Sequence, residues 1–291
     1  MTWRTVIVRE RAKLDYSLNF MTVRKEAEIR KISLSEIYMV IVESTAVSLT
    51  AVLLNELVKN KIKVVFCDEK RTPSSELLPY YGSHDTSLKY KYQLDWAEEC
   101  KQRVWTRIVY EKIYNQMLLL KKLNKDEYKL LEQYLNEIEW NDNSNREGHA
   151  AKVYFNALFG LDFSRNKECF VNAALDYGYS IILSAFNREI VSCGYFTQLG
   201  LCHKNPFNKF NLASDFMEPF RILVDEEVYN LEQSEFSKEH KNILINILNK
   251  TVTIDDKQQT VANVIKIYCR SLFTGLKEED LEYIKMYKYE L

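Results

Sequence analysis

The chain is predicted to adopt an α+β fold, in which an N-terminal β-rich domain precedes a larger all-helical domain. Two patterns predict this division. Apolar and polar residues alternate with period two in short runs up to about residue 43, whereas apolar residues beyond residue 85 recur at helical spacing. In addition, the 291 residues include only 7 glycines and 4 prolines, which favours helix over much of the chain.

The N-terminal domain is expected to span residues 1–70. Short alternating runs, separated by polar turns, predict strands over residues 5–8, 12–16, 20–23, 28–32 and 37–42. The apolar period becomes helical over residues 48–59. The apolar run at residues 63–67 then predicts a buried strand that follows this helix.

Turn-forming residues mark the boundary between the two domains. Proline, glycine and serine are concentrated at residues 71–75 and 80–83, so we expect a linker at residues 71–84. The second domain then covers residues 85–291. Helical periodicity predicts helices over residues 88–123, 126–138, 145–160 and 169–191.

Composition and charge exclude several classes of protein. With 40 Lys and Arg against 41 Asp and Glu, the net charge of −1 argues against a globally basic nucleic-acid binder, although local basic patches remain compatible with it. The six cysteines form no C-x-x-C pair, so zinc ribbons and thioredoxin-like chemistry are unsupported. Because no signal peptide or membrane-spanning run is evident, we expect a reduced, soluble, cytoplasmic protein.

The stretch from Leu201 to Phe220 places one histidine and two acids among apolar residues. Asp215 and Glu218 are three residues apart, so on a helix they would share one face. Carboxylates among core residues are costly unless a cation or proton compensates them. With His203 upstream, this set of nitrogen and oxygen ligands suits Mn²⁺ or Mg²⁺ better than structural zinc. The plainer alternative is a surface histidine beside two solvated acids.

Two local features bear on these acids. Glu147 lies in the first turn of the predicted helix 145–160, where the helix dipole favours an acid, but it also lies on the apolar stripe with Ala150. The residue before a proline disfavours helical geometry. Either Glu218 ends one helix in a non-helical conformation and Pro219 begins the next, which we favour, or the helix kinks at this point.

Several motifs in order resemble the CRISPR-associated spacer integrases. The motifs that carry this resemblance are residues 145–151 (NREGHAA), 184–195 (SAFNREIVSCGY), 199–203 (LGLCH) and 215–221 (DFMEPFR). The opening Trp3–Val8 and Leu14–Tyr16 resemble the subfamily that accompanies type II-A systems. The resemblance covers essentially the whole chain.

This resemblance implies a helical catalytic domain with a divalent metal, Mg²⁺ or Mn²⁺. The metal ligands of the family fall by motif on Glu147, His203 and Glu218, while Asp215 matches a second acid near the site. Because many members carry Asp at the third ligand position, the choice between Asp215 and Glu218 stays open. The implied reaction joins the 3′-OH of a foreign DNA fragment to a phosphodiester of the CRISPR array, with metal-dependent DNA endonuclease activity as related chemistry. Without metal, we expect the acids to repel one another.

The resemblance also implies partners. Double-stranded DNA, both the foreign fragment and the CRISPR leader-repeat, would contact basic residues near the ligands in sequence, although each of them could equally be a solvated side chain. These residues are Arg146, Lys152, Arg188, Lys204, Lys209 and Arg221.

The implied assembly is a homodimer. We expect the strand edges of residues 1–70 to form the dimer contact. Two such dimers would flank a dimer of the small second CRISPR adaptation protein, and type II-A systems add the effector nuclease and a ring-shaped DNA-end-binding protein. The alternatives are a non-catalytic DNA-binding scaffold subunit of this complex and a stand-alone metal-dependent DNA repair nuclease.

Overall fold

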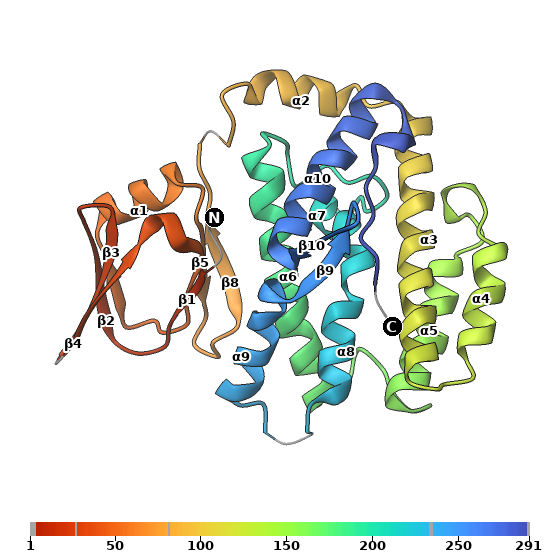
Figure 1. Cartoon of the computed structure of the whole chain (residues 1–291), viewed down its shortest axis with the longest axis horizontal. Coiled ribbons are helices and arrows are strands. Elements are labelled where there is room, and N and C mark those ends of the chain that lie inside the picture. The colour runs from red at the N-terminus through yellow and green to blue at the C-terminus, as the bar shows by residue number, and fades with distance from the viewer. Residues whose placement is uncertain (1–3, 27, 81, 233–234, 290–291) are drawn as a thin grey trace. The chain divides into compact units, whose positions relative to one another are not determined.

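The computed structural model describes residues 4–26, 28–80, 82–232 and 235–289. Trp3, which belongs to the opening motif, lies outside these residues. The chain divides into two compact units, residues 1–84 and residues 85–291. The first is built around β-sheets and the second is mainly helical, which confirms the predicted α+β fold (Figure 1).

A four-stranded sheet in the first unit has the strand order β1-β5-β7-β8. Its first three strands are parallel, and β8 runs antiparallel to β7. Every residue of β5 is buried, as expected for a central strand with both faces covered. The strands are β1 (Arg4–Val8), β5 (Ile37–Val42), β7 (Lys63–Cys67) and β8 (Pro73–Leu77).

A second sheet of four strands has the order β4-β3-β2-β6. Its strands and the helix that follows them are β2 (Ala12–Ser17), β3 (Phe20–Lys25), β4 (Glu28–Ser33), β6 (Val47–Leu49) and α1 (Ala51–Lys59). The Thr50 side chain caps α1 by accepting a hydrogen bond from the Leu53 amide at 3.3 Å. Leu14, Met21 and Leu53 are fully buried, so the core of this unit joins this sheet to α1.

The expected linker at residues 71–84 begins with regular structure instead. Asp68 Oδ1 accepts hydrogen bonds from the amides of Lys70 and Thr72, both at 2.9 Å, and this turn leads β7 into β8. The turn residues at 71–75 therefore belong to a hairpin, and β8 completes the first sheet. Tyr81, also within the expected linker, lies outside the described residues.

The second unit contains nine α-helices in its described residues, and these helices carry its core. They are α2 (Thr86–Leu94), α3 (Glu98–Lys122), α4 (Tyr128–Asn136), α5 (Arg146–Phe159), α6 (Phe170–Ser192), α7 (Asn211–Met217), α8 (Ile222–Asn230), α9 (Lys238–Asn246) and α10 (Val261–Glu278). The helix predicted over residues 88–123 is two helices, because the chain leaves helical hydrogen bonding between Leu94 and Glu98.

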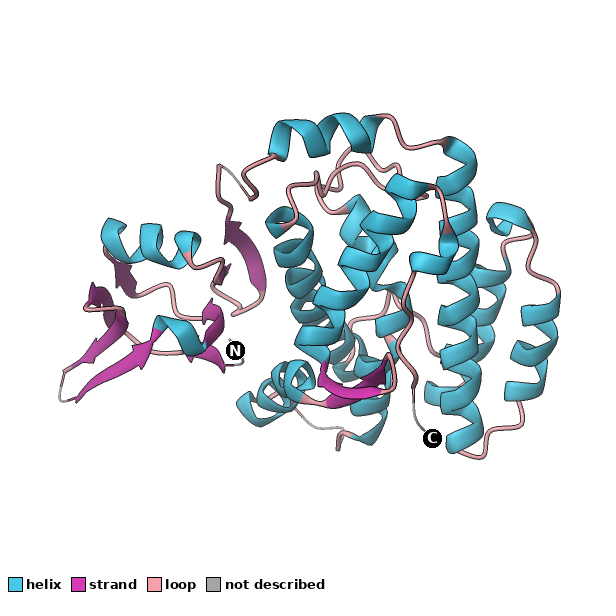
Figure 2. Cartoon of the chain, turned by 45° about the horizontal axis from the view of Figure 1, so that its top comes forward, coloured by secondary structure: helices cyan, strands magenta, loops and turns pink. Residues whose placement is uncertain are grey.

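The prediction that this unit is all helical is wrong in one place. A hairpin of β9 (Thr251–Ile254) and β10 (Lys257–Thr260) lies between α9 and α10 (Figure 2). Asp255 and Asp256 both have positive φ, as a tight two-residue hairpin turn requires. Strand β10 (KQQT) contains no apolar residue, so the hairpin leaves no alternation of apolar and polar residues over both strands.

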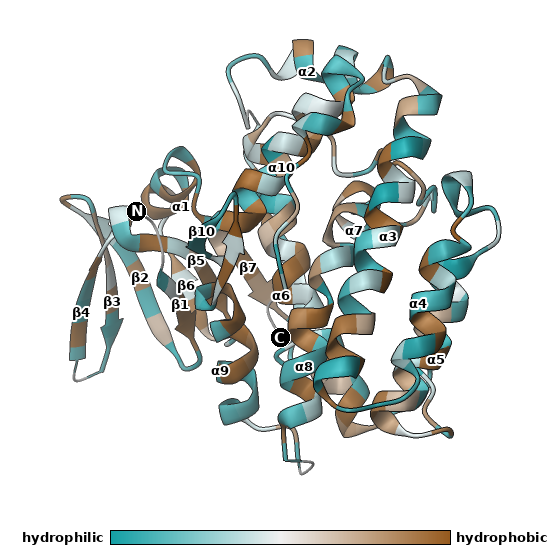
Figure 3. Cartoon of the chain, turned by 45° about the vertical axis from the view of Figure 1, so that its right-hand side comes forward, coloured by the Kyte–Doolittle hydropathy of each residue, from teal (hydrophilic) through white to brown (hydrophobic). Residues whose placement is uncertain are grey.

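Helix α3 and helix α6 organise the packing around the motifs. Helix α3 packs against α4, α5 and the 3₁₀ turn Glu218–Phe220, whereas α6 packs against α7, α9 and α10. Residues on α6 such as Ile181, Ile182 and Phe186 are fully buried, and hydrophobic colouring runs along this helix in Figure 3. Among the described residues, no helix has the length and apolar character needed to cross a membrane.

Candidate metal and active site

Glu147 is positioned by the cap of α5. Asp142 Oδ1 accepts a hydrogen bond from the Arg146 amide at 2.8 Å, and Asp142 Oδ2 accepts one from the Glu147 amide at 3.1 Å. The carboxylate thus satisfies amides that the first turn of a helix leaves free. Asp142 is buried, and burial raises the pKa of its carboxyl group. We did not predict this cap, although the polar loop at residues 141–145 was its signal.

Glu218 has helical backbone geometry, with φ −50° and ψ −45°, so the prediction of a non-helical Glu218 is wrong. Pro219 lies at the start of a 3₁₀ turn, Glu218–Phe220, where its missing N–H leaves no bond unmade. The chain therefore runs from α7 through this turn into α8 with helical geometry. This turn packs against α3, and the Glu218 side chain is buried against that helix.

A lysine on α3 joins the two glutamates. Lys112 Nζ lies 2.5 Å from Glu147 Oε1 and 2.6 Å from Glu218 Oε2. Burial opposes the charge of Lys112, but attraction to Glu218 and Glu147 outweighs it, so the pKa of Lys112 is raised. The sequence did not lead us to Lys112, although a lysine on the apolar face of the helix predicted over residues 88–123 was the available signal.

A second cation holds Glu218 from the other side. Arg221 Nε donates to Glu218 Oε1 at 2.9 Å. Burial would raise the pKa of Glu218, but Arg221 and Lys112 together lower it to about 2. The acids are therefore compensated by protein cations, and the expected repulsion between them in the metal-free protein is wrong for Glu147 and Glu218.

His203 is oriented by Asp215. The His203 Nδ1 and Asp215 Oδ1 atoms are hydrogen bonded, and Asp215 also accepts bonds from the amides of Leu201 (2.5 Å), Cys202 (3.1 Å) and His203 (3.2 Å). The bond to Asp215 raises the pKa of His203, although burial opposes the shift. Because Nδ1 is engaged, Nε2 is the ring nitrogen left for a ligand role.

The predicted ligands line two cavities. Glu147 and Glu218 line a cavity of about 260 Å³ together with Lys112, Gln116 and Arg221. His203 lines a different cavity, of about 510 Å³. Across the described ranges, no three His, Cys, Asp or Glu side chains are close enough to form a metal site as they stand. The charges of Glu218 and Glu147 nevertheless contribute to the raised pKa of His203, which shows that the three lie within electrostatic reach.

Asp225 is a further buried acid in the cavity of the two glutamates. It accepts a hydrogen bond from Tyr154 Oη at 3.0 Å and another from Tyr179 Oη. Burial raises the pKa of Asp225 to about 6. The Tyr179 ring in turn lies under the Arg221 guanidinium, 4.7 Å from the ring centroid, so this acid and this ring support the arginine that holds Glu218.

The six basic residues predicted near the ligands differ in their surroundings. Three are committed to protein partners: Arg146 to Glu137, Arg188 to Glu189 and Arg221 to Glu218. The other three, Lys152, Lys204 and Lys209, are exposed, and Lys204 makes a long ion pair of 3.7 Å with Glu98 Oε1. Lys204 and Lys209 line the cavity of His203, which places two exposed cations beside that ring.

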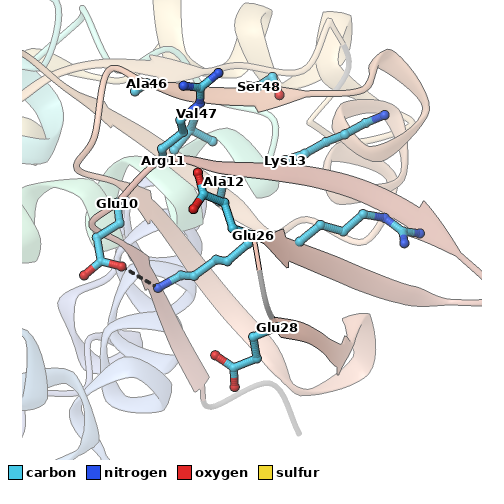
Figure 4. A pocket seen from close by; sticks show the side chains of 11 residues that line it. Glu10, Arg11, Ala12, Lys13, Glu26, Glu28, Ala46, Val47 and Ser48 are labelled. Atoms are coloured by element: carbon cyan, nitrogen blue, oxygen red, sulfur yellow. Dashed lines mark hydrogen bonds and ion pairs between the residues drawn. The ribbon is translucent and has the colours of Figure 1, made fainter.

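A larger cavity of about 970 Å³ lies in the first unit (Figure 4). Its charged side chains have both signs, and Lys25 Nζ pairs with Glu10 Oε2 at 2.9 Å across it. None of the predicted metal ligands lines this cavity, so we do not assign the site to it.

Gly200 is required for the close approach of the His203 loop to Asp215. A Cβ at this position would lie 2.4 Å from the His203 carbonyl oxygen and 2.7 Å from Asp215 Oδ2. We therefore expect Gly200→Ala to displace His203 and to reduce the strand-transfer activity that the sequence resemblance implies by roughly 100-fold, because a shift of about 1 Å in a reacting group has that effect. Gly148→Ala is the matched control, since its Cβ would meet only the movable Asn145 side chain. Equal activity of both variants would contradict this role.

Comparisons with known proteins identify relatives over nearly the whole chain. The family described as CRISPR associated protein Cas1 matches residues 5–250. The CRISPR-associated endonuclease Cas1 of Neisseria meningitidis serogroup C (strain 8013) is 32% identical over 98% of this chain and 96% of its own length. The CRISPR-associated endonuclease Cas1 1 of Pyrobaculum aerophilum is 26% identical over 76% of this chain and 79% of its own.

Two solved structures have the same fold. A casposase bound to integration product matches with a TM-score of 0.76 and 20% identity, covering 95% of this chain and 91% of the other. A Cas1 protein from Thermotoga maritima also matches with a TM-score of 0.76 and 20% identity, covering 94% and 97%. The chain therefore belongs to the Cas1 family of CRISPR-associated proteins, the endonucleases and integrases of CRISPR adaptation.

Proposed function

We propose that the protein captures short foreign double-stranded DNA and inserts it as a new spacer into the CRISPR array by metal-dependent transesterification. In this reaction a 3′-OH attacks a phosphodiester, the new ester bond forms, and the displaced 3′-oxygen leaves. The observation that carries the proposal is the convergence of Glu147 and Glu218 on one cation, together with a histidine that is fixed by a buried carboxylate. Nicking of DNA is the same chemistry with water as the nucleophile.

The residues fit a divalent cation. Glu147 and Glu218 already share the positive charge of Lys112, and the buried Glu218 Oε2 has no partner with hydrogen-bond geometry among the described residues. Carboxylate oxygens and an imidazole nitrogen suit Mg²⁺ or Mn²⁺. Glu147, Glu218 and the Nε2 atom of His203 would hold the ion. When bound, such an ion lowers the pKa of the attacking hydroxyl group and neutralises charge on the phosphoryl oxygens.

The choice between Asp215 and Glu218 as third ligand rests on what each acid already binds. Asp215 is fully buried, and its two oxygens accept three amide hydrogen bonds in addition to the bond with His203. Glu218 lines the cavity, and its partners among the described residues are the cations Lys112 and Arg221. We assign Glu218 as the ligand and Asp215 as the residue that positions His203.

Lys204 and Lys209 are proposed to bind DNA phosphates beside His203. Each phosphate contact contributes about 0.9 to the slope of log affinity against log salt, so Lys204→Ala/Lys209→Ala is expected to reduce the magnitude of that slope by about 1.8. Fluorescence anisotropy with a labelled duplex at several salt concentrations measures it. The exposed Lys257 on β10 lines neither cavity and provides the control variant. An unchanged slope in the double variant would rule out these contacts.

A homodimer formed through the first unit is the proposed assembly. Its sheets leave β1, β8, β4 and β6 as edge strands, and the β2–β4 segment exposes Leu18, Phe20 and Ile29. Because β8 pairs with β7, a clean truncation must remove residues 1–84 rather than 1–70. We expect residues 85–291 to be monomeric by light scattering, whereas a dimeric truncated chain would refute this role.

The further partners follow from the same proposal. One solved structure that shares the fold, with a TM-score of 0.75 and 18% identity, is a Cas6-RT-Cas1–Cas2 complex. We propose that two dimers of this protein flank a central dimer of the small protein Cas2. The opening motif further leads us to propose a type II-A-like subfamily, with the effector nuclease and the ring-shaped DNA-end-binding protein as partners, which co-purification from co-expressed proteins would test.

The experiment for the proposed function follows a labelled fragment with a free 3′-OH into a leader-repeat duplex. We expect joined product with Mg²⁺ or Mn²⁺ in the presence of Cas2 and none with EDTA. A non-catalytic scaffold would bind the duplex and join nothing with any metal. A stand-alone repair nuclease would cut branched or free DNA with metal, and Cas2 would make no difference to its products.

A further inference from the structure

Lys112 lies between two proposed metal ligands, Glu147 and Glu218, which share the positive charge of its ammonium group. Its ammonium nitrogen is 2.5 Å from Glu147 Oε1 and 2.6 Å from Glu218 Oε2, and its side chain is only 10% exposed. A divalent ion bound by the same two carboxylates would lie within the same few ångströms. An ammonium group and a divalent ion repel strongly at such a distance in a buried site, so they cannot share it.

The contact with Glu218 is an ion pair without hydrogen-bond geometry. Glu218 Oε2 is buried, and among the described residues no donor meets the geometric requirement for a bond to it, although the ammonium lies at 2.6 Å. This contact is therefore a close ion pair with poor hydrogen-bond geometry. A divalent ion aligned with the lone pairs of this oxygen would bind it in better geometry than the lysine does.

Gln116 offers the ammonium another acceptor. It lies one helical turn after Lys112 on α3, so the two side chains are neighbours on the helix surface. Gln116 is 4% exposed and lines the same cavity, and its Oε1 has no hydrogen-bond partner among the described residues. A buried amide oxygen without a partner is costly, and an incoming ammonium would satisfy it.

We propose that Lys112 is an internal cation that holds the two ligand carboxylates together in the metal-free protein and withdraws to Gln116 when a divalent ion binds. The inference rests on the proposed metal-dependent function. It gives Lys112 a positioning role: the ligands are kept in place without metal, and the affinity for metal is set by competition with the lysine. After it moves away from the carboxylates, the ammonium group of Lys112 stays in the same cavity, which Arg221 also lines.

The test measures Mn²⁺ binding without DNA, by calorimetry and by electron paramagnetic resonance of free Mn²⁺. Lys112→Met removes the competing charge but keeps most of the side-chain volume, so we expect it to bind Mn²⁺ about tenfold more tightly or better. Lys112→Arg keeps the positive charge, and an arginine that bridges two carboxylates is displaced less readily than a lysine. This variant should therefore bind Mn²⁺ more weakly than wild type. Lys121→Met, on an exposed position of α3, is the matched control.

Gln116→Leu tests where the ammonium goes. We expect this variant to weaken Mn²⁺ binding when Lys112 is present and to have no effect in the Lys112→Met background, because only the lysine uses the amide oxygen. Equal weakening in both backgrounds would overturn the withdrawal to Gln116. Wild-type or weaker Mn²⁺ affinity in Lys112→Met would overturn the competition itself.

Melting curves in EDTA and in Mn²⁺ accompany the binding data. Lys112→Met leaves two carboxylates without their shared cation, so we expect a lower melting temperature in EDTA and a larger gain from Mn²⁺ than in wild type. If Lys112→Met does not fold in EDTA, the Lys112→Arg and Gln116→Leu affinities decide the outcome. Failure of the proposed function can be told apart from failure of the inference about Lys112, because in the first case wild-type protein would bind no Mn²⁺ and join no DNA.

Discussion

Glu218→Ala is expected to reduce DNA strand transfer by on the order of 1,000-fold or more, because a ligand that acts on charge developing in the transition state is lost. DNA binding should persist, since exposed lysines such as Lys204 remain. The same change should lower the stability of the metal-free protein. Lys112 and Arg221 both lose a buried counter-charge, and breaking a buried ion pair in this way costs about 3–5 kcal/mol.

Glu218→Gln separates the two effects. It keeps the size of the side chain and an oxygen acceptor but removes the charge, so we expect strand transfer to be lost while stability falls less than in Glu218→Ala. Gel analysis of joined product and thermal melting in EDTA provide the two measurements. A Glu218→Ala variant that transfers strands at the wild-type rate would contradict its assignment as a ligand, and a raised melting temperature would contradict the ion pairs.

Asp215→Ala is expected to reduce activity by less than Glu218→Ala does, and for a different reason. The variant leaves the amides of Leu201, Cys202 and His203 without their acceptor and frees the His203 ring to rotate. Only the bond from the Leu201 amide is fully buried, and a buried donor left unsatisfied costs about 1–3 kcal/mol, so we expect a loss of at least about 1 kcal/mol of stability. Loss of the partner that orients a metal-binding histidine typically reduces metal affinity or activity by about 10–100-fold.

Ser214→Ala provides the neighbouring control, because within the part of the chain that the structure describes its hydroxyl group accepts a single long bond, of 3.4 Å, from Asn208. The two acids should also differ in metal rescue. Raising the Mn²⁺ concentration should restore part of the activity of Asp215→Ala, whose three ligands remain, but not of Glu218→Ala. Rescue of Glu218→Ala together with no rescue of Asp215→Ala would exchange the two assignments.

The fold was largely predictable because it depends on periodicity that survives in single segments. Strand β5 was predicted from an alternating run, and the buried strand β7 from an apolar run. The parts that could not be predicted depend on tertiary contacts, or on segments whose residues show no clear hydrophobic periodicity. Strand β8 has a polar sequence, PSSEL, and is a strand only because β7 presents its edge to it.

The candidate site likewise contains residues that the sequence predicted and residues that it did not. Sequence motifs singled out Glu147, His203, Asp215 and Glu218, and the structure gives each a defined set of partners. Lys112 was missed because it is 35 residues from Glu147 in sequence and its contact arises only from the packing of α3 against α5. The same is true of Asp225, whose tyrosine partners are 71 and 46 residues away.

Local rules also failed where tertiary structure outweighed them. The expectation for Glu218 used the preference of a residue before proline for extended geometry. That preference is worth little here, because burial of Pro219 and Phe220 against the rest of the unit fixes the 3₁₀ turn and Glu218 with it. The expected repulsion between acids failed similarly, since the cations that compensate them come from α3 and from the residue after the turn.

The most direct test of the account is a crystal structure with Mn²⁺, in which anomalous scattering locates the ion. We predict one ion with Glu147, His203 Nε2 and Glu218 at roughly 2.0–2.6 Å, with Asp215 still bonded to His203 Nδ1 and with Lys112 withdrawn from both carboxylates. An ion bound by Asp215 in place of Glu218, or a structure soaked in Mn²⁺ that keeps Lys112 between the glutamates and shows no anomalous peak there, would contradict it.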